Sequence, residues 1–169
     1  MKVSDPELHE VDDYLLTDKF LLPGIPTWDT RFGGQYSARW GLIDATGLQV
    51  GELAFSCLLN LSRPSITLLH RQHLVHRTDL VPPEETKPNP VAALSVGAPR
   101  LVTGSHMHLW SDSREHVRLN GFKDLPVRRP TPSALRTFEQ ALAATCDVLN
   151  IHPTPDQRAF NLPDQADLF

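Results

Sequence analysis

Residues 35–61, QYSARWGLIDATGLQVGELAFSCLLNL, alternate between apolar and polar side chains on either side of a turn signal at 44–47. The apolar positions of the first half are Tyr36, Ala38, Trp40 and Leu42. Those of the second half are Leu53, Phe55, Cys57 and Leu59. A period of two is typical of a strand with one buried face. The stretch therefore predicts an antiparallel hairpin.

The segments that follow extend this hairpin into a sheet. Residues 66–81 are rich in β-branched residues, leucine and histidine and predict a third, long strand, 101–110 predict a fourth, and 116–119 a weaker fifth. Residues 82–100 contain five prolines and predict a long surface loop with a turn of helix at 91–94. The pattern indicates a four- to five-stranded antiparallel meander.

Helices are expected at both ends of the chain. Ser4 before Asp5-Pro6 is typical of a helix start, and a short acidic helix should run to about residue 18. Near the C-terminus, Thr131 is the expected N-cap of a helix over 131–151, with Pro132 in its first turn. Its apolar residues follow the helical spacing: Leu135, Phe138, Leu142, Cys146 and Leu149. This helix should cover one face of the sheet.

Length and composition favour one α+β domain over residues 1–169, because 169 residues with 40% apolar content can bury a single core. Within it we expect a helix and irregular lead over 1–34, the sheet over 35–119 and a C-terminal amphipathic helix over 131–151. The tail, 152–169, has no periodic pattern and is expected to be ordered in part by docking of Phe160 or Phe169.

Charge and cysteine usage restrict the class of protein. The chain has 16 Lys+Arg against 20 Asp+Glu, so it lacks a global basic field and any phosphate site must be local. Cys57 and Cys146 lie in apolar patterns, which favours buried thiols over a disulfide. The N-terminus has no signal pattern, and no run approaches the roughly 20 apolar residues of a membrane span. We expect a cytoplasmic protein without a membrane partner.

Histidines are concentrated in the middle of the chain. Five of the eight lie between His70 and His108. If 101–110 is a strand, His106, His108 and Trp110 point to one side while Met107 and Leu109 face the core. Two imidazoles on one face can act as an acid and a base near neutral pH, or they can bind a metal ion.

Arg77 and Asp79 share one face of the preceding strand, and they are either a solvated ion pair or part of the same site.

Three interpretations of His106 and His108 follow. They have no role; they bind a metal ion together with His70, His76 or Asp79; or they catalyse metal-independent phosphoryl chemistry in which Arg77 or Arg71 stabilises charge. The sequence contains no H-E-x-x-H motif, nucleotide-binding loop or G-x-S-x-G motif.

The order of these motifs, Arg77-x-Asp79 and then Gly104-x-His106-x-His108-x-Trp110, resembles small uncharacterised prokaryotic proteins with an R-x-D … G-P-H-x-H-[WY] pattern. More distantly, it is similar to TumE-type toxins of toxin-antitoxin pairs, which are regarded as ribonucleases that inhibit translation. The resemblance spans roughly residues 35 to 150. Ser105 stands where the pattern has proline, and the loop before it is longer than in the pattern.

The leading hypothesis is a toxin-like endoribonuclease that needs no metal or other cofactor. Its expected catalytic residues are His106, His108, Arg77 and Asp79. Its expected substrate-binding residues are His76, Arg71 and Trp110. The expected partners are RNA and an antitoxin or host protein.

Two alternatives stay open. The first is a nonenzymatic protein of a phage or other mobile element that inhibits a host defence or nucleic-acid complex, using its acidic surface. The second is a small metal-dependent hydrolase.

Overall fold

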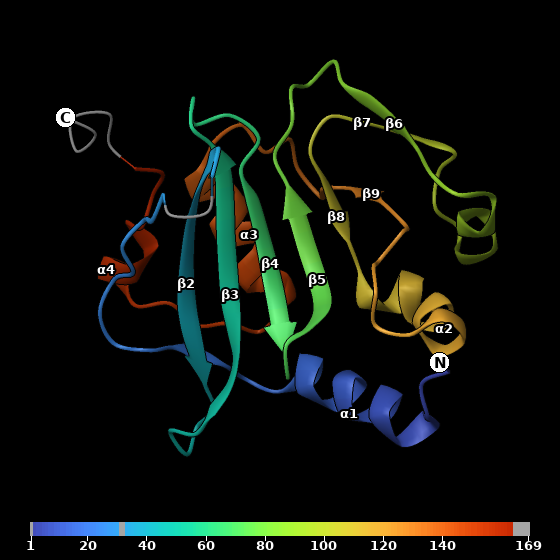
Figure 1. The fold of residues 1–169 in the computed structure, drawn as a ribbon, viewed down its shortest axis with the longest axis horizontal. Helices are drawn as coiled ribbons and strands as arrows, with labels where there is room; N and C mark the ends of the chain where they lie inside the picture. The colour runs from blue at the N-terminus through green and yellow to red at the C-terminus, as the bar shows by residue number, and fades with distance from the viewer. Residues whose placement is uncertain (1, 31–32, 164–169) are drawn as a thin grey trace.

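The computed structural model describes residues 2–30 and 33–163 of the chain, and its centre is an antiparallel sheet of seven strands (Figure 1). The strands follow the order β1-β2-β3-β4-β5-β8-β9, and β6 and β7 form a separate two-stranded sheet. The strands are β1 (Phe20–Leu21), β2 (Gln35–Ile43), β3 (Gln49–Leu58), β4 (Ser65–His70), β5 (His73–Asp79), β6 (Thr86–Pro88), β7 (Leu101–Thr103), β8 (His106–His108) and β9 (Arg129–Pro130). The helices are α1 (Asp5–Leu16), the 3-10 helix η1 (Val91–Val96), α2 (Trp110–Asn120), α3 (Phe138–Val148) and α4 (Pro155–Arg158).

The α+β class, the antiparallel meander and the short N-terminal helix are confirmed. The predicted hairpin is β2 and β3, with Tyr36 opposite Cys57 and Trp40 opposite Leu53. These apolar side chains are buried on the face of the sheet that α3 covers, and α3 lies behind the sheet in Figure 1. Within the described residues, no helix combines the length and apolar character of a membrane span.

The prediction of one long strand over 66–81 is wrong, because the segment folds into the hairpin β4–β5. Its two-residue turn places Arg71 and Gln72 at φ 48° and 66°, in the left-handed region. Hairpin turns of this kind usually contain glycine or asparagine, and neither is present here. The strand pattern therefore continues through the turn without an interruption that the sequence would reveal.

Residues 82–110, predicted as a loop followed by one strand, also differ from the prediction. They form three short strands, a 3-10 helix and the start of α2. The expected helical turn is η1, but β6 pairs with β7, with Lys87 opposite Val102, outside the main sheet. Gly104, at φ 78°, then turns the chain back, and β8 joins the main sheet beside β5. Glycine adopts this conformation without the strain of a side chain.

The weak strand predicted over 116–119 is wrong, since these residues belong to α2. This helix begins at Trp110, so that residue is not on a strand with His106 and His108. The helix buries Trp110, Ser113 and Val117, which recur at the spacing of one helical face. This helical period, rather than the local β propensity of residues 116–119, determines the structure of the segment.

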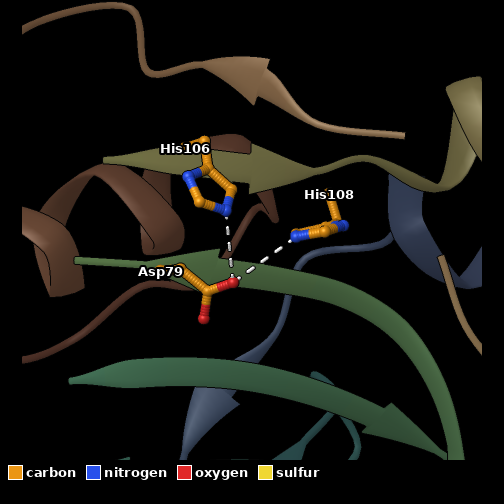
Figure 2. Close-up of side chains that lie close together, drawn as sticks. All are labelled: Asp79, His106 and His108. Carbon is orange, nitrogen blue, oxygen red and sulfur yellow. Dashed lines mark ion pairs between the residues drawn. The ribbon is translucent and has the colours of Figure 1, made fainter. Parts of the chain in front are cut away.

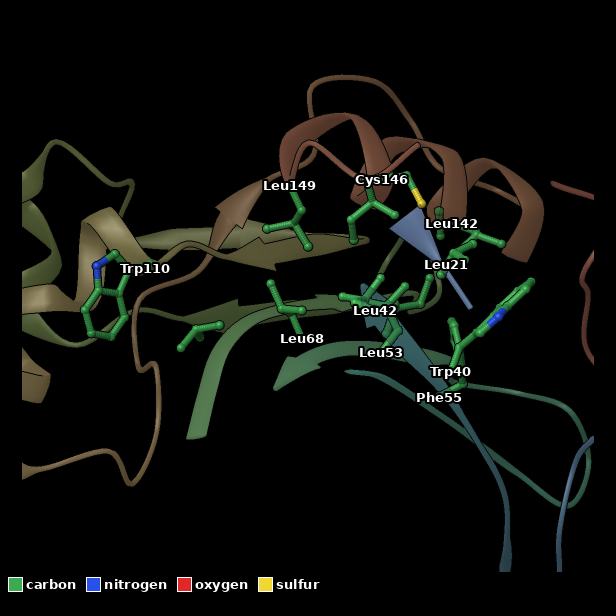
Figure 3. Packing of buried hydrophobic residues seen from close by; sticks show 14 of the residues in the cluster. Leu21, Trp40, Leu42, Leu53, Phe55, Leu68, Trp110, Leu142, Cys146 and Leu149 are labelled. Carbon is green, nitrogen blue, oxygen red and sulfur yellow. The ribbon is translucent and has the colours of Figure 1, made fainter. Parts of the chain in front are cut away.

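The C-terminal helix begins later than predicted, at Phe138. Its N-cap is Thr137, whose hydroxyl accepts a hydrogen bond from the Gln140 amide at 3.2 Å, whereas the Thr131 hydroxyl donates to the Ser133 carbonyl. Figure 3 shows Leu142, Cys146 and Leu149 facing Leu42, Leu53 and Leu68 of the sheet, as the helical spacing predicted. Cys57 and Cys146 are both buried free thiols.

The tail beyond α3 is anchored by one aromatic side chain. Phe160 is buried, and its ring centroid lies 5.0 Å from that of Phe55 and 5.5 Å from that of Trp28. The expected docking of Phe160 is confirmed. Phe169 lies outside the described residues.

Lys19 is fully buried at the junction between α1 and β1. Its Nζ donates to the carbonyls of Thr17 at 2.5 Å and Leu15 at 3.4 Å and lies 4.7 Å from the centre of the Tyr14 ring. Burial lowers the pKa of Lys19 to about 8, and the nearby Asp18 only partly opposes this shift. The fold therefore holds an ammonium group that loses its proton more readily than it does in the unfolded chain.

This burial predicts a pH dependence of stability. Between pH 8 and 10.5 the unfolded state holds a proton on Lys19 that the folded state has lost, so the free energy of unfolding should rise with pH. Relative to Lys19→Met, the wild type should gain about 2 kcal/mol between pH 7 and 9.5. Urea unfolding at both pH values measures this difference. The exposed Lys123→Met should show no such gain, and parallel pH curves for wild type and Lys19→Met would contradict the prediction.

Candidate metal centre

The pairing of β5 with β8 brings the two sequence motifs together. Asp79 lies opposite His106, and Arg77 lies opposite His108. Directly opposed residues of an antiparallel pair point to the same face, so all four side chains share the face that α3 does not cover. The intervening Thr78 and Met107 are buried on the opposite face.

Both imidazoles converge on one oxygen of the Asp79 carboxylate (Figure 2). Nε2 of His106 lies 3.5 Å from Oδ2 of Asp79, and Nε2 of His108 lies 3.4 Å from the same oxygen. One ligand atom from each of the three residues lies within 4.8 Å of the others. In the described part of the chain, this is the one group of three or more histidine, cysteine and acidic residues placed closely enough to hold a metal ion.

Backbone carbonyls fix the orientation of both rings. Nδ1 of His106 lies 3.0 Å from the Gly104 carbonyl oxygen, and Nδ1 of His108 lies 2.5 Å from that of Leu125. A carbonyl only accepts hydrogen bonds, so each Nδ1 carries the proton. In a neutral ring Nε2 then presents a lone pair. Nε2 of His106 is buried and makes no hydrogen bond.

This arrangement places two imidazole nitrogens against one carboxylate oxygen. Burial by itself raises the pKa of Asp79, but the imidazoles of His106 and His108 and the guanidinium of Arg77 outweigh it and hold this pKa well below its ordinary value. The site is therefore built around a carboxylate. A positive charge beside this oxygen, either a proton on an imidazole or a metal ion, stabilises the carboxylate.

Arg77 orients the carboxylate from its other side. Its Nε donates to Oδ1 of Asp79 at 2.7 Å, which leaves Oδ2 to face the imidazoles. The Arg77 side chain is 47% exposed, whereas those of His106 and Asp79 are 1% and 10% exposed. Arg77 thus connects a buried centre to the protein surface.

The residues present fit a divalent transition metal of the zinc type. Two imidazoles and one carboxylate are a common ligand set of catalytic zinc. Bonds of about 2.0–2.1 Å at a tetrahedral angle place ligand atoms roughly 3.3–3.4 Å apart, close to the two distances between imidazole and carboxylate. Hydrogen bonds from Nδ1 to carbonyl oxygens are the usual outer contacts of metal-binding histidines. His106, His108 and Asp79 would hold the ion.

The other residues predicted for the site lie elsewhere. His76 is buried on the α3 face, where its Nε2 contacts the Thr78 hydroxyl at 3.0 Å, and burial lowers its pKa to about 3. Arg71 lies in the β4–β5 turn and pairs with Glu10 of α1 at 2.8 Å. Trp110 is buried at the start of α2 and donates to Asp12 at 2.7 Å. The structure does not bring these three residues to the cluster.

Two contributors to the centre have no side-chain signal in the sequence. These are the carbonyl groups of Gly104 and Leu125, which hold the imidazoles. Backbone groups carry no side-chain signal, and Leu125 is distant in sequence from the histidine that it contacts.

Comparison with known proteins adds no relative: no family model matches the chain, and no curated protein or solved structure is similar enough to count as a match.

Proposed function

We propose that the protein is a small metal-dependent hydrolase in which Asp79, His106 and His108 bind one zinc-type ion. The observation that carries the proposal is the convergence of two Nε2 atoms, each with its Nδ1 fixed by a carbonyl, on one carboxylate oxygen. Of the sequence-based hypotheses, the metal-dependent alternative fits this geometry best. Among its three candidates for the third ligand, the cluster contains Asp79.

The number of ligands supports catalysis over a purely structural role. Structural zinc sites usually have four protein ligands, whereas catalytic sites have three and leave a position for water or substrate. A bound zinc ion would supply a water molecule acidic enough to act as a nucleophile near neutral pH. The half-exposed guanidinium of Arg77, held by Asp79, lies where it could stabilise negative charge on an ester or phosphoester undergoing attack.

The metal-independent ribonuclease stays a prediction with weaker geometric support. Acid and base catalysis requires each imidazole to reach the substrate. His106 is 1% exposed, and the Nε2 atoms of both histidines are directed at Asp79. An RNA backbone would have to displace the buried carboxylate before it could contact either ring.

Metal content tests the proposal directly. Protein purified without chelator and incubated with Zn²⁺ should retain about one ion per chain after desalting, measured by inductively coupled plasma mass spectrometry. His106→Ala/His108→Ala should retain less than a tenth of this amount, because two of the three ligands are removed. The loaded wild type should hydrolyse p-nitrophenyl acetate or bis(p-nitrophenyl) phosphate, and a chelator should abolish the hydrolysis.

A matched control is His116→Ala/His152→Ala. These histidines also pair with carboxylates, those of Asp124 and Asp18, at 2.8 Å each, but their side chains are 35% and 54% exposed. The control should keep the full metal content. Equal metal retention by both double variants, or RNA cleavage by metal-free protein that needs His106 and His108, would reject the proposed function.

A further inference from the structure

A large cleft lies at the end of the sheet where β5 ends and β8 begins. Its volume is ≈ 1240 Å³. Its walls come from four segments that are distant in sequence: the β3–β4 connection at 61–64, the chain after β5 at 80–83, the β7–β8 turn at 103–105 and the approach to α3 at 133–138. A volume of this order accommodates a small organic ligand.

The lining combines an apolar floor with hydroxyl groups. Leu80, Leu135 and Phe138 are buried beneath the cleft. The Ser105 hydroxyl lies among them, 3.4 Å from the Leu135 carbonyl and 3.3 Å from the Val81 amide. Small-molecule sites typically have this composition, with apolar surface for the body of a ligand and a few polar groups to orient it.

The charged side chains in the described lining are all basic. Among the described residues that line the cleft, these side chains are Arg63 and Arg136, and none is an aspartate or glutamate. This contrasts with the whole chain, which has 20 acidic residues against 16 basic ones. A cleft with one sign of charge and low-dielectric walls attracts ligands of the opposite sign.

The two arginines are available to a ligand. Arg63 contacts Glu85 at 2.6 Å, but its side chain is 47% exposed. Its backbone, at φ 53°, adopts a left-handed conformation that is unusual for a residue with a side chain. Arg136 is exposed, and its side chain forms no ion pair within the described part of the chain. Guanidinium groups bind carboxylates and phosphates in a bidentate manner.

The cleft is separate from the metal centre, although the two share chain segments. Leu80 packs in the hydrophobic core, and the Ser105 hydroxyl lies 3.4 Å from the Leu135 carbonyl, whereas the metal ligands lie on the face that α3 does not cover. Gly104 belongs to both, because its carbonyl holds His106 while the residue itself lines the cleft. A ligand could therefore occupy the cleft whether or not a metal is bound.

We propose that this cleft binds a small amphipathic organic anion, with its apolar body over Leu80, Leu135 and Phe138 and its phosphate or carboxylate group at Arg63 and Arg136. This is a second site, beyond the hydrolytic centre. The two arginines supply the attraction for the anionic group, and the leucine and phenylalanine side chains exclude water from the rest of the ligand.

Isothermal titration calorimetry with matched probes tests this assignment. In the presence of a chelator, the full chain should bind 1-naphthyl phosphate at least tenfold more tightly than the uncharged 1-naphthol, because charge-assisted hydrogen bonds are lost with the anionic group. 1-Naphthoate, as a third probe, tells a phosphate preference from a general anion site. Binding of either anion above the naphthol level supports the proposal.

Variants locate the binding. Arg63→Gln/Arg136→Gln should weaken 1-naphthyl phosphate binding by at least tenfold, and Arg136→Gln alone, an exposed change that the fold tolerates, should weaken it several-fold. The control Arg39→Gln/Arg118→Gln removes two arginines that pair with Glu52 and Glu115 outside the cleft, and it should bind like the wild type. Equal affinity for naphthol and the anions, or full binding by both Arg136→Gln and the double variant, would overturn the assignment. Because the titrations are made without metal, a failed metal centre leaves their outcome unchanged.

Discussion

Asp79→Asn should abolish stabilisation by zinc and should also destabilise the metal-free protein by about 1–3 kcal/mol, because the folded state stabilises the Asp79 carboxylate and holds its pKa well below the ordinary value. The carboxylate of the wild type lies between two imidazole Nε2 atoms and the Arg77 guanidinium. An asparagine amide keeps an oxygen that accepts from Arg77 Nε, but it has no negative charge to pair with that guanidinium or to bind a metal ion. The substitution therefore removes both a stabilised buried charge and a metal ligand.

Thermal unfolding with a chelator and with excess Zn²⁺ measures both effects. At a thousandfold excess over its dissociation constant, a ligand of the native state adds about 4 kcal/mol, which is roughly 8–16 °C for a domain of this size. The wild type should show this rise, and Asp79→Asn should show almost none. Asp18→Asn makes the same chemical change at an exposed contact with His152 and should keep the full rise. A similar rise in Asp79→Asn would exclude Asp79 as a ligand.

The features of the fold that could be predicted from the sequence are those in which apolar and polar side chains alternate regularly along a short segment. The alternation over 35–61 defined a hairpin because every second side chain of a strand points to the same face. The same argument placed Arg77 with Asp79, and His106 with His108, on common faces, and the register confirms both pairs. These inferences needed no knowledge of distant contacts.

The missed features depend on contacts between distant segments or on unusual backbone conformations. The β4–β5 turn uses left-handed Arg71 and Gln72, which ordinary turn preferences do not predict. Trp110 begins a helix because α2 can bury one face against the core, a tertiary effect that outweighs strand propensity.

The candidate metal centre likewise combines features that the sequence predicts with features that only the folded sheet defines. The sequence predicted that the imidazoles of His106 and His108 share one face of a strand. Asp79 was one of three candidates for a third metal ligand. The choice of Asp79 requires β5 and β8 to pair across residues 80–105, in a register that only the folded sheet defines. The carbonyl of Leu125, which fixes His108, comes from the connection after α2 and has no sequence signature.

Phe160→Ala should destabilise the protein by about 3–5 kcal/mol, although its side chain lies in a tail without periodic pattern. The ring is 4% exposed and fills the space among Trp28, Trp40, Phe55 and Phe138, with centroid distances of 5.0–5.8 Å. Removing it leaves a cavity and breaks several aromatic contacts at once. It also frees the chain beyond α4 from the core, so that Trp28 loses its stacked partner.

Urea unfolding monitored by tryptophan fluorescence should show the loss, because Trp28 and Trp40 both contact the ring. Phe20→Ala is the matched control. It deletes the same side chain at a position that is 37% exposed, with one aromatic contact to His152 at 5.5 Å, and should cost about 1 kcal/mol. Equal losses for the two variants would mean that the tail does not dock through Phe160. A large loss for Phe160→Ala alone would establish that Phe160, two residues after α4, completes the hydrophobic core.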